Sequence, residues 1–479
     1  MNSEVKLQLA ALLSDDDPAA RRRAAEDLSE SSGFAPIAAL AAALRDENKG
    51  VRDSALRSLS RIGNENVARA AVEYIADENI VTRNLAAELL MRLKDHSVGA
   101  LLPYLYDVDQ DVRKFAVDIL GLIGNDQTVD HILPLLDDAD ENVVVSAAEA
   151  LGNIKSRRAV SHLIRVFKLH DYAKAVVAES LGKIGDEEAG EFLLKYLSAL
   201  IADEEADRLV LYSVIDALGL IGGSSAVQTI REGVARVSGR LRLALLHTLI
   251  RILDRLHRPL SDLTEFRGDL LSAIQCEDCG VRISAARALG EIPDEEVTSA
   301  LVSNLGQTEE IDAVILPLLE KRPEIFRVVV HMAESGVLKP NKEVIALLGR
   351  ICSLIDYGTM AEGRLSDLSR LLESAFEFVS GGWAEASEDT RGAIVDTMLR
   401  LDADRAFEYL ASVTEEPDPW LRIHVIELVA PLENRGIPEF IARFLSDDDE
   451  MVREVAASTL ESKGYSPQAE THEDSAEHP

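Results

Sequence analysis

Apolar side chains recur along this chain at the three- and four-residue spacing of one helix face, in short segments separated by polar turns. The stretch Asp107–Gly124 contains one such segment, and residues 129–136 contain the next. Gly124 stands where a left-handed residue commonly ends a helix. The pattern therefore predicts a unit of helix, turn, helix and turn. The apolar positions of the two helices are Val112, Ala116, Leu120 and Ile123, then Val129, Ile132, Leu133 and Leu136.

The first helix of this unit carries an arginine that returns about every 31 residues. Four residues before each arginine stands a side chain suited to cap a helix N-terminus. A fixed period of this length is typical of a solenoid of stacked repeats. The arginines are Arg21, Arg52, Arg83, Arg113, Arg242, Arg282, Arg391, Arg422 and Arg453. The expected caps are Asp17, Asn48, Asn79, Asp109, Ser238, Asp278, Ser387, Asp418 and Asp449.

Glycine also recurs directly after the repeated leucine of the first helix of the unit. Glycine inside a helix costs about 1 kcal/mol relative to alanine, so its repetition predicts a close helix–helix contact as compensation. The positions are Gly121, Gly152, Gly182, Gly219 and Gly290.

Lapses in the pattern divide the chain into four segments. Residues 1–291 form a regular solenoid that begins with an amphipathic helix at Met1–Leu13, and residues 388–463 return to the repeat. Residues 292–387 are divergent helical repeats that continue the solenoid; a partner-specific insertion and a separate domain are the alternatives. Residues 464–479 are acidic and poor in apolar side chains, which predicts a disordered tail.

The repeated phrase resembles the HEAT repeat family, in the short bacterial form that also occurs in phycobilin lyases. Val51-Arg52 with Ile62-Gly63, and Val112-Arg113 with Ile123-Gly124, carry the resemblance. It implies an all-α fold, a right-handed α-α superhelix of the HEAT/armadillo type with roughly twelve to fourteen helix pairs. It also implies that aspartates and arginines of neighbouring repeats stack as a structural ladder. The ladder residues are Asp46, Arg52, Asp77, Arg83, Asp107 and Arg113.

Charge narrows the classes of partner. The chain has 50 basic and 84 acidic side chains and a net charge of −34. Nucleic-acid binding depends on basic side chains that neutralise phosphates, so we expect no nucleic-acid partner and no anionic membrane surface. With three cysteines, no signal peptide and no apolar run of ~20 residues, the sequence predicts a cytoplasmic protein.

Candidate chemistry is sparse, and we expect no catalytic residue, no cofactor and no metal site. Cys276 and Cys279 form a C-x-x-C in the turn before Arg282, but no second pair follows at zinc spacing. We interpret them as variation within a turn. HEAT-type deoxyhypusine hydroxylases bind iron through His-Glu pairs, and the one such pair here, His472-Glu473, lies in the expected tail.

A second periodic position, five residues after each arginine position, is acidic in five successive repeats. By the resemblance, these helices face the concave side of the solenoid. The acidic column is then either a groove for a basic segment or a solvated face with local ion pairs, such as Glu88 with Arg92 and Glu179 with Lys183. Asp118, Glu149 and Asp216 lack a cation four residues later. The column consists of Glu88, Asp118, Glu149, Glu179 and Asp216.

These observations favour a non-enzymatic function. We expect a protein–protein interaction scaffold or adaptor that binds another protein, through a basic segment, along its concave face. A phycobilin-lyase-like enzyme subunit or chaperone is one alternative, and a regulatory partner in a bacterial signalling system is the other.

Overall fold

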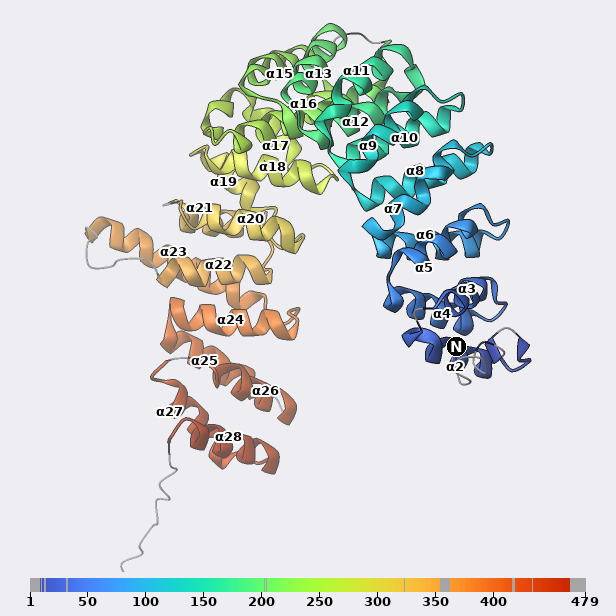
Figure 1. Ribbon diagram of the computed structural model, residues 1–479. Coiled ribbons are helices and arrows are strands. Elements are labelled where there is room, and N and C mark those ends of the chain that lie inside the picture. Colours follow the sequence, from blue (N-terminus) through green and yellow to red (C-terminus); the bar gives the residue numbers. More distant parts are fainter. Residues whose placement is uncertain are drawn as a thin grey trace, which may run out of the picture. The chain divides into compact units, whose positions relative to one another are not determined.

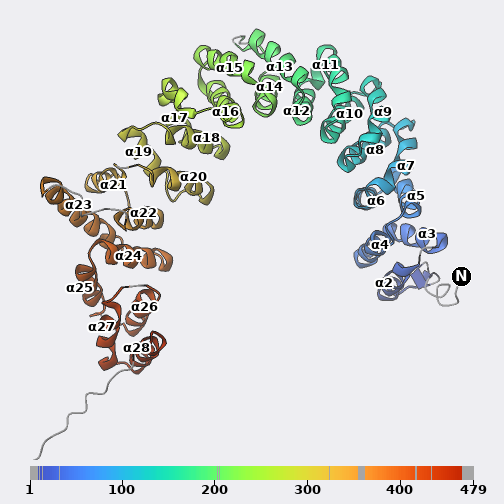
Figure 2. The same ribbon diagram turned by 60° about the vertical axis from the view of Figure 1, so that its left-hand side comes forward.

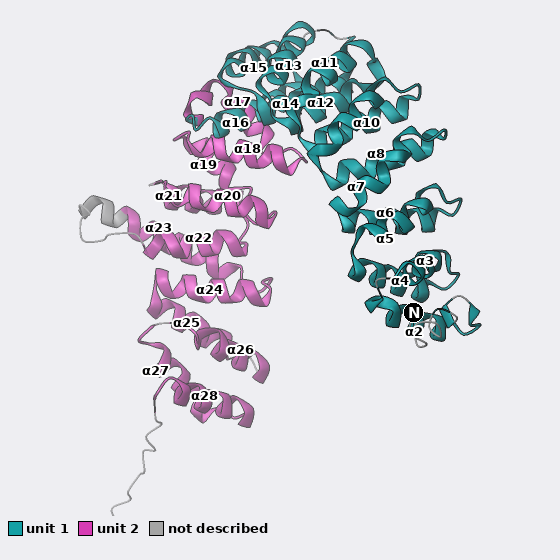
Figure 3. Ribbon diagram, viewed as in Figure 1, with its two compact units in different colours: residues 1–259 teal, residues 260–479 magenta. Residues whose placement is uncertain are grey.

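A computed structural model describes residues 9–465, apart from positions 10, 13, 32, 202, 204, 323, 354–361, 416–417 and 433. The described residues are predominantly helical and contain 27 α-helices and no strands, so the predicted all-α class is correct (Figure 1). Most of the predicted helix at Met1–Leu13 and of the tail after Gly464 lies outside the described residues. The chain divides into two compact units, Met1–Pro259 and Leu260–Pro479 (Figure 3).

Unit 1 consists of two layers of helices, one on the inner side of the curve that this unit describes and one on the outer side (Figure 2). Each inner helix packs against the next inner helix and against its outer neighbours. The inner helices are α2 (Pro18–Asp27), α4 (Lys49–Ile62), α6 (Ile80–Leu93), α8 (Gln110–Ile123), α10 (Glu141–Ile154), α12 (Lys174–Ile184), α14 (Arg208–Ile221) and α16 (Gly239–Arg255). The outer helices are α3 (Phe34–Ala42), α5 (Glu65–Val72), α7 (Asp95–Leu101), α9 (Val129–Ile132), α11 (Val160–Leu169), α13 (Glu187–Leu200) and α15 (Ser224–Arg236).

Unit 2 is also built of repeats that each contain two helices. The stretch predicted as divergent, residues 292–387, is helical where the structure describes it and contains α19 to α23. The helices are α17 (Arg267–Ala273), α18 (Cys279–Gly290), α19 (Glu295–Val302), α20 (Glu309–Leu319), α21 (Ile325–Glu334), α22 (Lys342–Ser353), α23 (Glu362–Gly381), α24 (Glu388–Leu401), α25 (Ala403–Val413), α26 (Pro419–Val429), α27 (Ile437–Ala442) and α28 (Glu450–Ser462).

Local sequence explains where the arginine-bearing helices begin and end. The Asn48 side chain accepts hydrogen bonds from the amides of Gly50 and Val51, and Asp109 accepts from Asp111, so these N-caps are confirmed. Gly124 ends α8 in the left-handed region at φ 74°, as predicted. The predicted cap at Ser238 is wrong: the chain enters α16 through Gly239 at φ +63°, and the Ser238 side chain makes no capping bond.

The recurring glycines let the inner helices α8 to α14 approach closely. A Cβ atom built on Gly121 would lie 2.6 Å from the Cα of Ala150. The corresponding distances are 2.7 Å from Gly152 to Ser180 and 3.0 Å from Gly182 to Ala217. These separations leave no room for a side chain, which confirms the predicted helix–helix contact.

Candidate functional site

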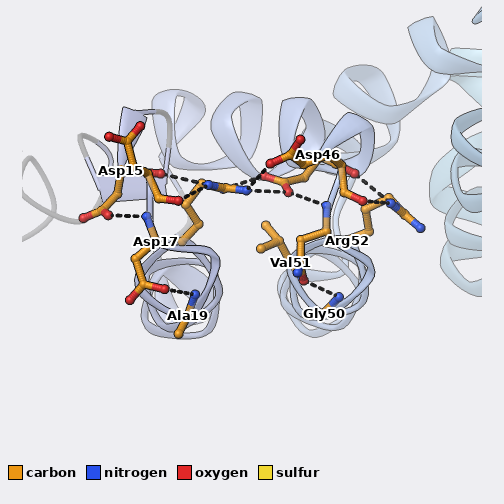
Figure 4. A network of polar contacts seen from close by, with 11 residues as sticks. Asp15, Asp17, Ala19, Asp46, Gly50, Val51 and Arg52 are labelled. Carbon is orange, nitrogen blue, oxygen red and sulfur yellow. Dashed lines mark hydrogen bonds and ion pairs between the residues drawn. The ribbon is translucent and has the colours of Figure 1, made fainter.

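An arginine near the beginning of each of the helices α2, α8 and α26 joins one repeat to the next. In the first repeat, the guanidinium of Arg21 donates from Nε and Nη2 to the carboxylate of Asp46, at 2.8 and 3.0 Å. Its Nη1 donates to the carbonyl of Asp15, six residues earlier, at 2.9 Å. Figure 4 shows these contacts around Asp15 and Asp46. Arg21 thus stabilises the turn before its own helix and also binds the following repeat.

The same two-sided contact recurs at Arg113, which binds the Asp138 carboxylate and the Asp107 carbonyl, and Arg422 makes the corresponding contact with the Asp447 carboxylate. The Arg113 and Asp138 side chains are only 15% and 10% exposed, and their bidentate geometry is the strong form of this pair. The hydrogen bond from Arg113 lowers the pKa of the Asp138 carboxyl, although its partial burial acts in the opposite direction. In each case the carboxylate lies 25 residues after the arginine.

The structure places the other predicted ladder residues differently. Arg52 and Arg83 donate to the backbone carbonyls of Asp46 and Asp77, at 2.8 and 3.1 Å. The Asp77 carboxylate instead pairs with Arg45, the last residue of the short 3-10 helix Ala43–Arg45 that follows the outer helix α3. Within the described chain, no carboxylate pairs with the guanidinium of Arg83. The Asp107 carboxylate accepts from the amide of Asp109.

The acidic column occupies one position on each of five successive inner helices of unit 1, from α6 to α14. Because the outer helices and neighbouring inner helices cover the other sides, the exposed side of these helices is the inner surface of the unit (Figure 2). Glu149, Glu179 and Asp216 are exposed, and Glu88 and Asp118 are half-buried. The geometry thus places the five side chains along one surface.

Local ion pairs compensate part of this column, in a pattern that differs from the predicted one. Glu88 pairs with Arg92 as predicted. Asp118 lacks a cation four residues later, as predicted, but Lys114, four residues earlier, contacts its carboxylate at 2.7 Å. The predicted pair of Glu179 with Lys183 is also wrong, since Lys183 donates to Asn153 of the preceding repeat at 2.9 Å.

Two carboxylates of the column are left without a cation. Among the described residues, neither Glu149 nor Glu179 takes part in an ion pair or a side-chain hydrogen bond. A pocket of about 350 Å³ lies beside Glu149, between α8 and α10. Its lining includes Asp118 and Leu122, a leucine that is 65% exposed. The inner surface at this point therefore combines negative charge with accessible apolar area.

A second pocket, of about 340 Å³, lies between α6 and α8 and was not predicted. Arg83, Ile80 and Phe115 are among its lining residues. Ile80 is the first residue of α6, and the equivalent first residues of α8 and α10 are Gln110 and Glu141. The apolar residue at this position of α6, where α4, α8 and α10 begin with polar residues, is the feature of the sequence that distinguishes this junction.

The remaining candidate chemistry is limited. Cys276 and Cys279 are free thiols; Cys279 is the first residue of α18, and the Cys276 thiol lies 3.5 Å from the carbonyl of Asp278. In the part of the chain that the structure describes, no group of three or more His, Cys, Asp or Glu side chains has an arrangement that could hold a metal ion. No helix in that part has both the length and the apolar character needed to cross a membrane.

Two models of repeat families match the chain. The model for HEAT repeats matches residues 6–91 and 98–173. The model for the PBS lyase HEAT-like repeat matches residues 173–199 and 281–307. No curated protein sequence matches the chain. The matches cover most of residues 6–199 in unit 1 and one repeat of unit 2.

Among solved structures, the chain is similar to importin beta crystallised in ammonium sulfate, with 13% identity over 95% of this chain and 74% of that one, at a TM-score of 0.49. Yeast importin-beta (Kap95p) has 13% identity over 96% and 73% of the two chains, at a TM-score of 0.40. The complex of CpcE and CpcF of phycocyanin lyase from Nostoc sp. PCC7120 has 22% identity over 53% of this chain and 96% of that chain, at a TM-score of 0.25.

Proposed function

This chain is a HEAT-repeat protein, and we propose that it is a non-catalytic scaffold that binds a basic segment of another protein along the inner surface of unit 1. The observation that carries the proposal is the position of Glu149 and Glu179. These carboxylates are exposed on adjacent inner helices, and no cation of the described chain neutralises either of them. A lysine or arginine of a partner supplies the missing charge.

The free energies of exposed ion pairs are small, so the proposed binding depends on several weak contacts rather than on one strong contact. An ion pair at an exposed site contributes about 0.2–1 kcal/mol, so Glu149 and Glu179 together contribute about 0.4–2 kcal/mol. Apolar contacts with side chains such as Leu122, which is 65% exposed, add to the affinity. Binding of this kind is sensitive to salt, because ions screen exposed charges beyond about 10 Å at 0.1 M ionic strength.

Affinity capture from native cells tests the proposal when matched variants are compared. The charge-reversal variant is Glu149→Lys with Glu179→Lys. The control is Glu187→Lys with Glu191→Lys, which makes the same change of charge on the exposed side of the outer helix α13. We expect the wild type and the control to capture the same protein, identified by mass spectrometry, and the charge-reversal variant to lose it. Equal capture by all three folded proteins would contradict the proposal.

A second candidate function rests on the match of residues 173–199 and 281–307 to the PBS lyase HEAT-like repeat. A lyase-like subunit or chaperone for a chromophore would hold a pigment. An absorption spectrum of protein purified from its native cells separates the two functions. A visible band that co-purifies with the protein favours the chromophore function, and a spectrum with the protein band alone favours the scaffold.

A further inference from the structure

The junction between α6 and α8 differs from the inner junctions that follow it. At the position of Gly121 in α8, helix α6 carries Met91, so the close backbone approach of the later helices does not extend to this junction. The Arg83 guanidinium has no carboxylate partner within the described chain. The pocket of about 340 Å³ lies at this junction.

The pocket has an apolar wall and an apolar rim. Ile75, Ile80, Val112 and Phe115 line it. Ile80 is 61% exposed, and Val108, in the adjacent turn, is fully exposed at 100%. An exposed apolar side chain such as Ile80 at a partly apolar pocket is typical of a site of protein interaction.

The pocket continues into the acidic surface of α8 and α10. Lys114 lines both this pocket and the one beside Glu149, and its ammonium pairs with Asp118 in the lining of the second pocket. In the α6–α8 pocket, Asp109 and Asp111 are balanced by Arg83 and Lys114. The uncompensated negative charge lies farther along the same surface, at Glu149 and Glu179, and there it favours a basic segment.

We infer that the α6–α8 pocket seats one large apolar side chain of the same basic segment that follows the acidic column. This inference rests on the proposed function and adds the anchor residue that sets the position of the segment. Buried apolar anchors in central pockets carry much of the binding energy of protein interfaces, while exposed charges contribute mainly to specificity and association rate. The partner is thus a protein segment with one large apolar residue followed by several lysines or arginines.

A phage-displayed library of random peptides tests this inference. Peptides of about 16 residues are long enough, at ~3.3 Å per residue, to cross four helices that lie about 9 Å apart. Peptides selected on the full-length protein are synthesised, and their affinities are measured by fluorescence polarisation. The variants are Ile80→Ser and Phe115→Ala, and the control is Phe34→Ser, which changes an exposed apolar residue (81%) on the outer helix α3. Circular dichroism confirms that each variant is folded.

We expect selected peptides to combine one large apolar residue with a basic run, and to bind Ile80→Ser or Phe115→Ala about thirty-fold more weakly than the wild type. The control should bind like the wild type. Peptides that are only basic, peptides insensitive to both pocket variants, or a library without binders would overturn the anchor. The effect of the double variant Glu149→Lys with Glu179→Lys on peptide binding tests the proposed function separately. Peptides that need Ile80 but not these carboxylates would contradict the inference that one segment binds both the pocket and the acidic column.

Discussion

The inner helices α2–α6 and α8–α14 of unit 1 carry the same repeat, but the carboxylates on their surfaces differ in whether a cation neutralises them. In the first group, Glu26 contacts Arg22 and Arg57, and Glu88 contacts Arg92. In the second group, Glu149 and Glu179 are exposed and have no partner among the described residues. The first surface is internally neutralised, and the second holds uncompensated negative charge.

The cations that neutralise the first surface come from several positions. Arg92 lies four residues after Glu88 on the same helix, whereas Glu26 contacts Arg22 of its own helix and Arg57 of the next inner helix. In the second group, Lys183 follows Glu179 by four residues but donates to Asn153 instead. An acidic column by itself therefore says little about binding, because the contacts made by cations of the same and neighbouring helices determine whether its charge is neutralised. The same helices α8–α14 also contain the glycines that bring their backbones together.

The largest expected effect concerns these glycines. Gly152→Ala places a Cβ about 2.7 Å from Ser180, and we expect a loss of about 2–3 kcal/mol in unfolding free energy from overpacking. Gly99→Ala, in α7, is the matched control, because nothing lies within 4 Å of its added Cβ. We expect Gly99→Ala to stabilise the protein by up to about 1 kcal/mol through helix propensity. Urea denaturation measures the change in unfolding free energy for both variants. A change in the same direction for the two variants would contradict the close-packing argument.

The next effect compares a complete ladder contact with an incomplete one. Arg113→Ala leaves the carboxylate of Asp138, which is 10% exposed, and the carbonyl of Asp107 without their donor. We expect a loss of about 2 kcal/mol, because unsatisfied polar groups that are nearly buried are costly. Arg83→Ala removes only the bond to the Asp77 carbonyl, and we expect a loss of about 1 kcal/mol or less. Equal losses in urea denaturation would show that the carboxylate contact contributes nothing.

The sequence predicted the caps, the helix order and the glycine contacts because these depend on residues close in the chain or on a strict period. It did not predict which ladder contacts form, because an ion pair between repeats depends on the distance between successive helices. Spacing alone does not identify the pairs: Asp77 follows Arg52 by 25 residues, just as the paired Asp138 follows Arg113, yet the Asp77 carboxylate pairs with Arg45. The partner of Lys183 could not be predicted from the sequence either, because Asn153 lies on the neighbouring inner helix.

A smaller effect is the pH dependence of the Arg113–Asp138 contact. The pKa of Asp138 is lowered in the folded protein, chiefly by the hydrogen bond from Arg113, relative to about 3.9 in an unfolded chain. A lowered pKa contributes stability above the unfolded value, and this stability is lost as the pH falls through the folded value. We therefore expect the stability difference between wild type and Arg113→Ala to be constant near neutral pH and to shrink below about pH 4. Denaturation at a series of pH values tests this, and a difference that persists in acid would assign the effect to packing.

The smallest expected effect returns to the two inner surfaces. Glu88→Gln removes one member of the ion pair with Arg92, and we expect a loss of about 0.3–0.5 kcal/mol, as for other exposed pairs four residues apart. Glu149→Gln removes a charge that has no partner in the described chain, and lowers repulsion in a protein of net charge −34. We expect this variant to be unchanged or stabilised by a few tenths of a kcal/mol. Thermal denaturation at low and high salt measures both, and salt should remove the difference because exposed charges are screened. If Glu149→Gln is as destabilising as Glu88→Gln, then Glu149 belongs to the internally neutralised surface, and the inner face of α8–α14 loses the property that distinguishes it from α2–α6.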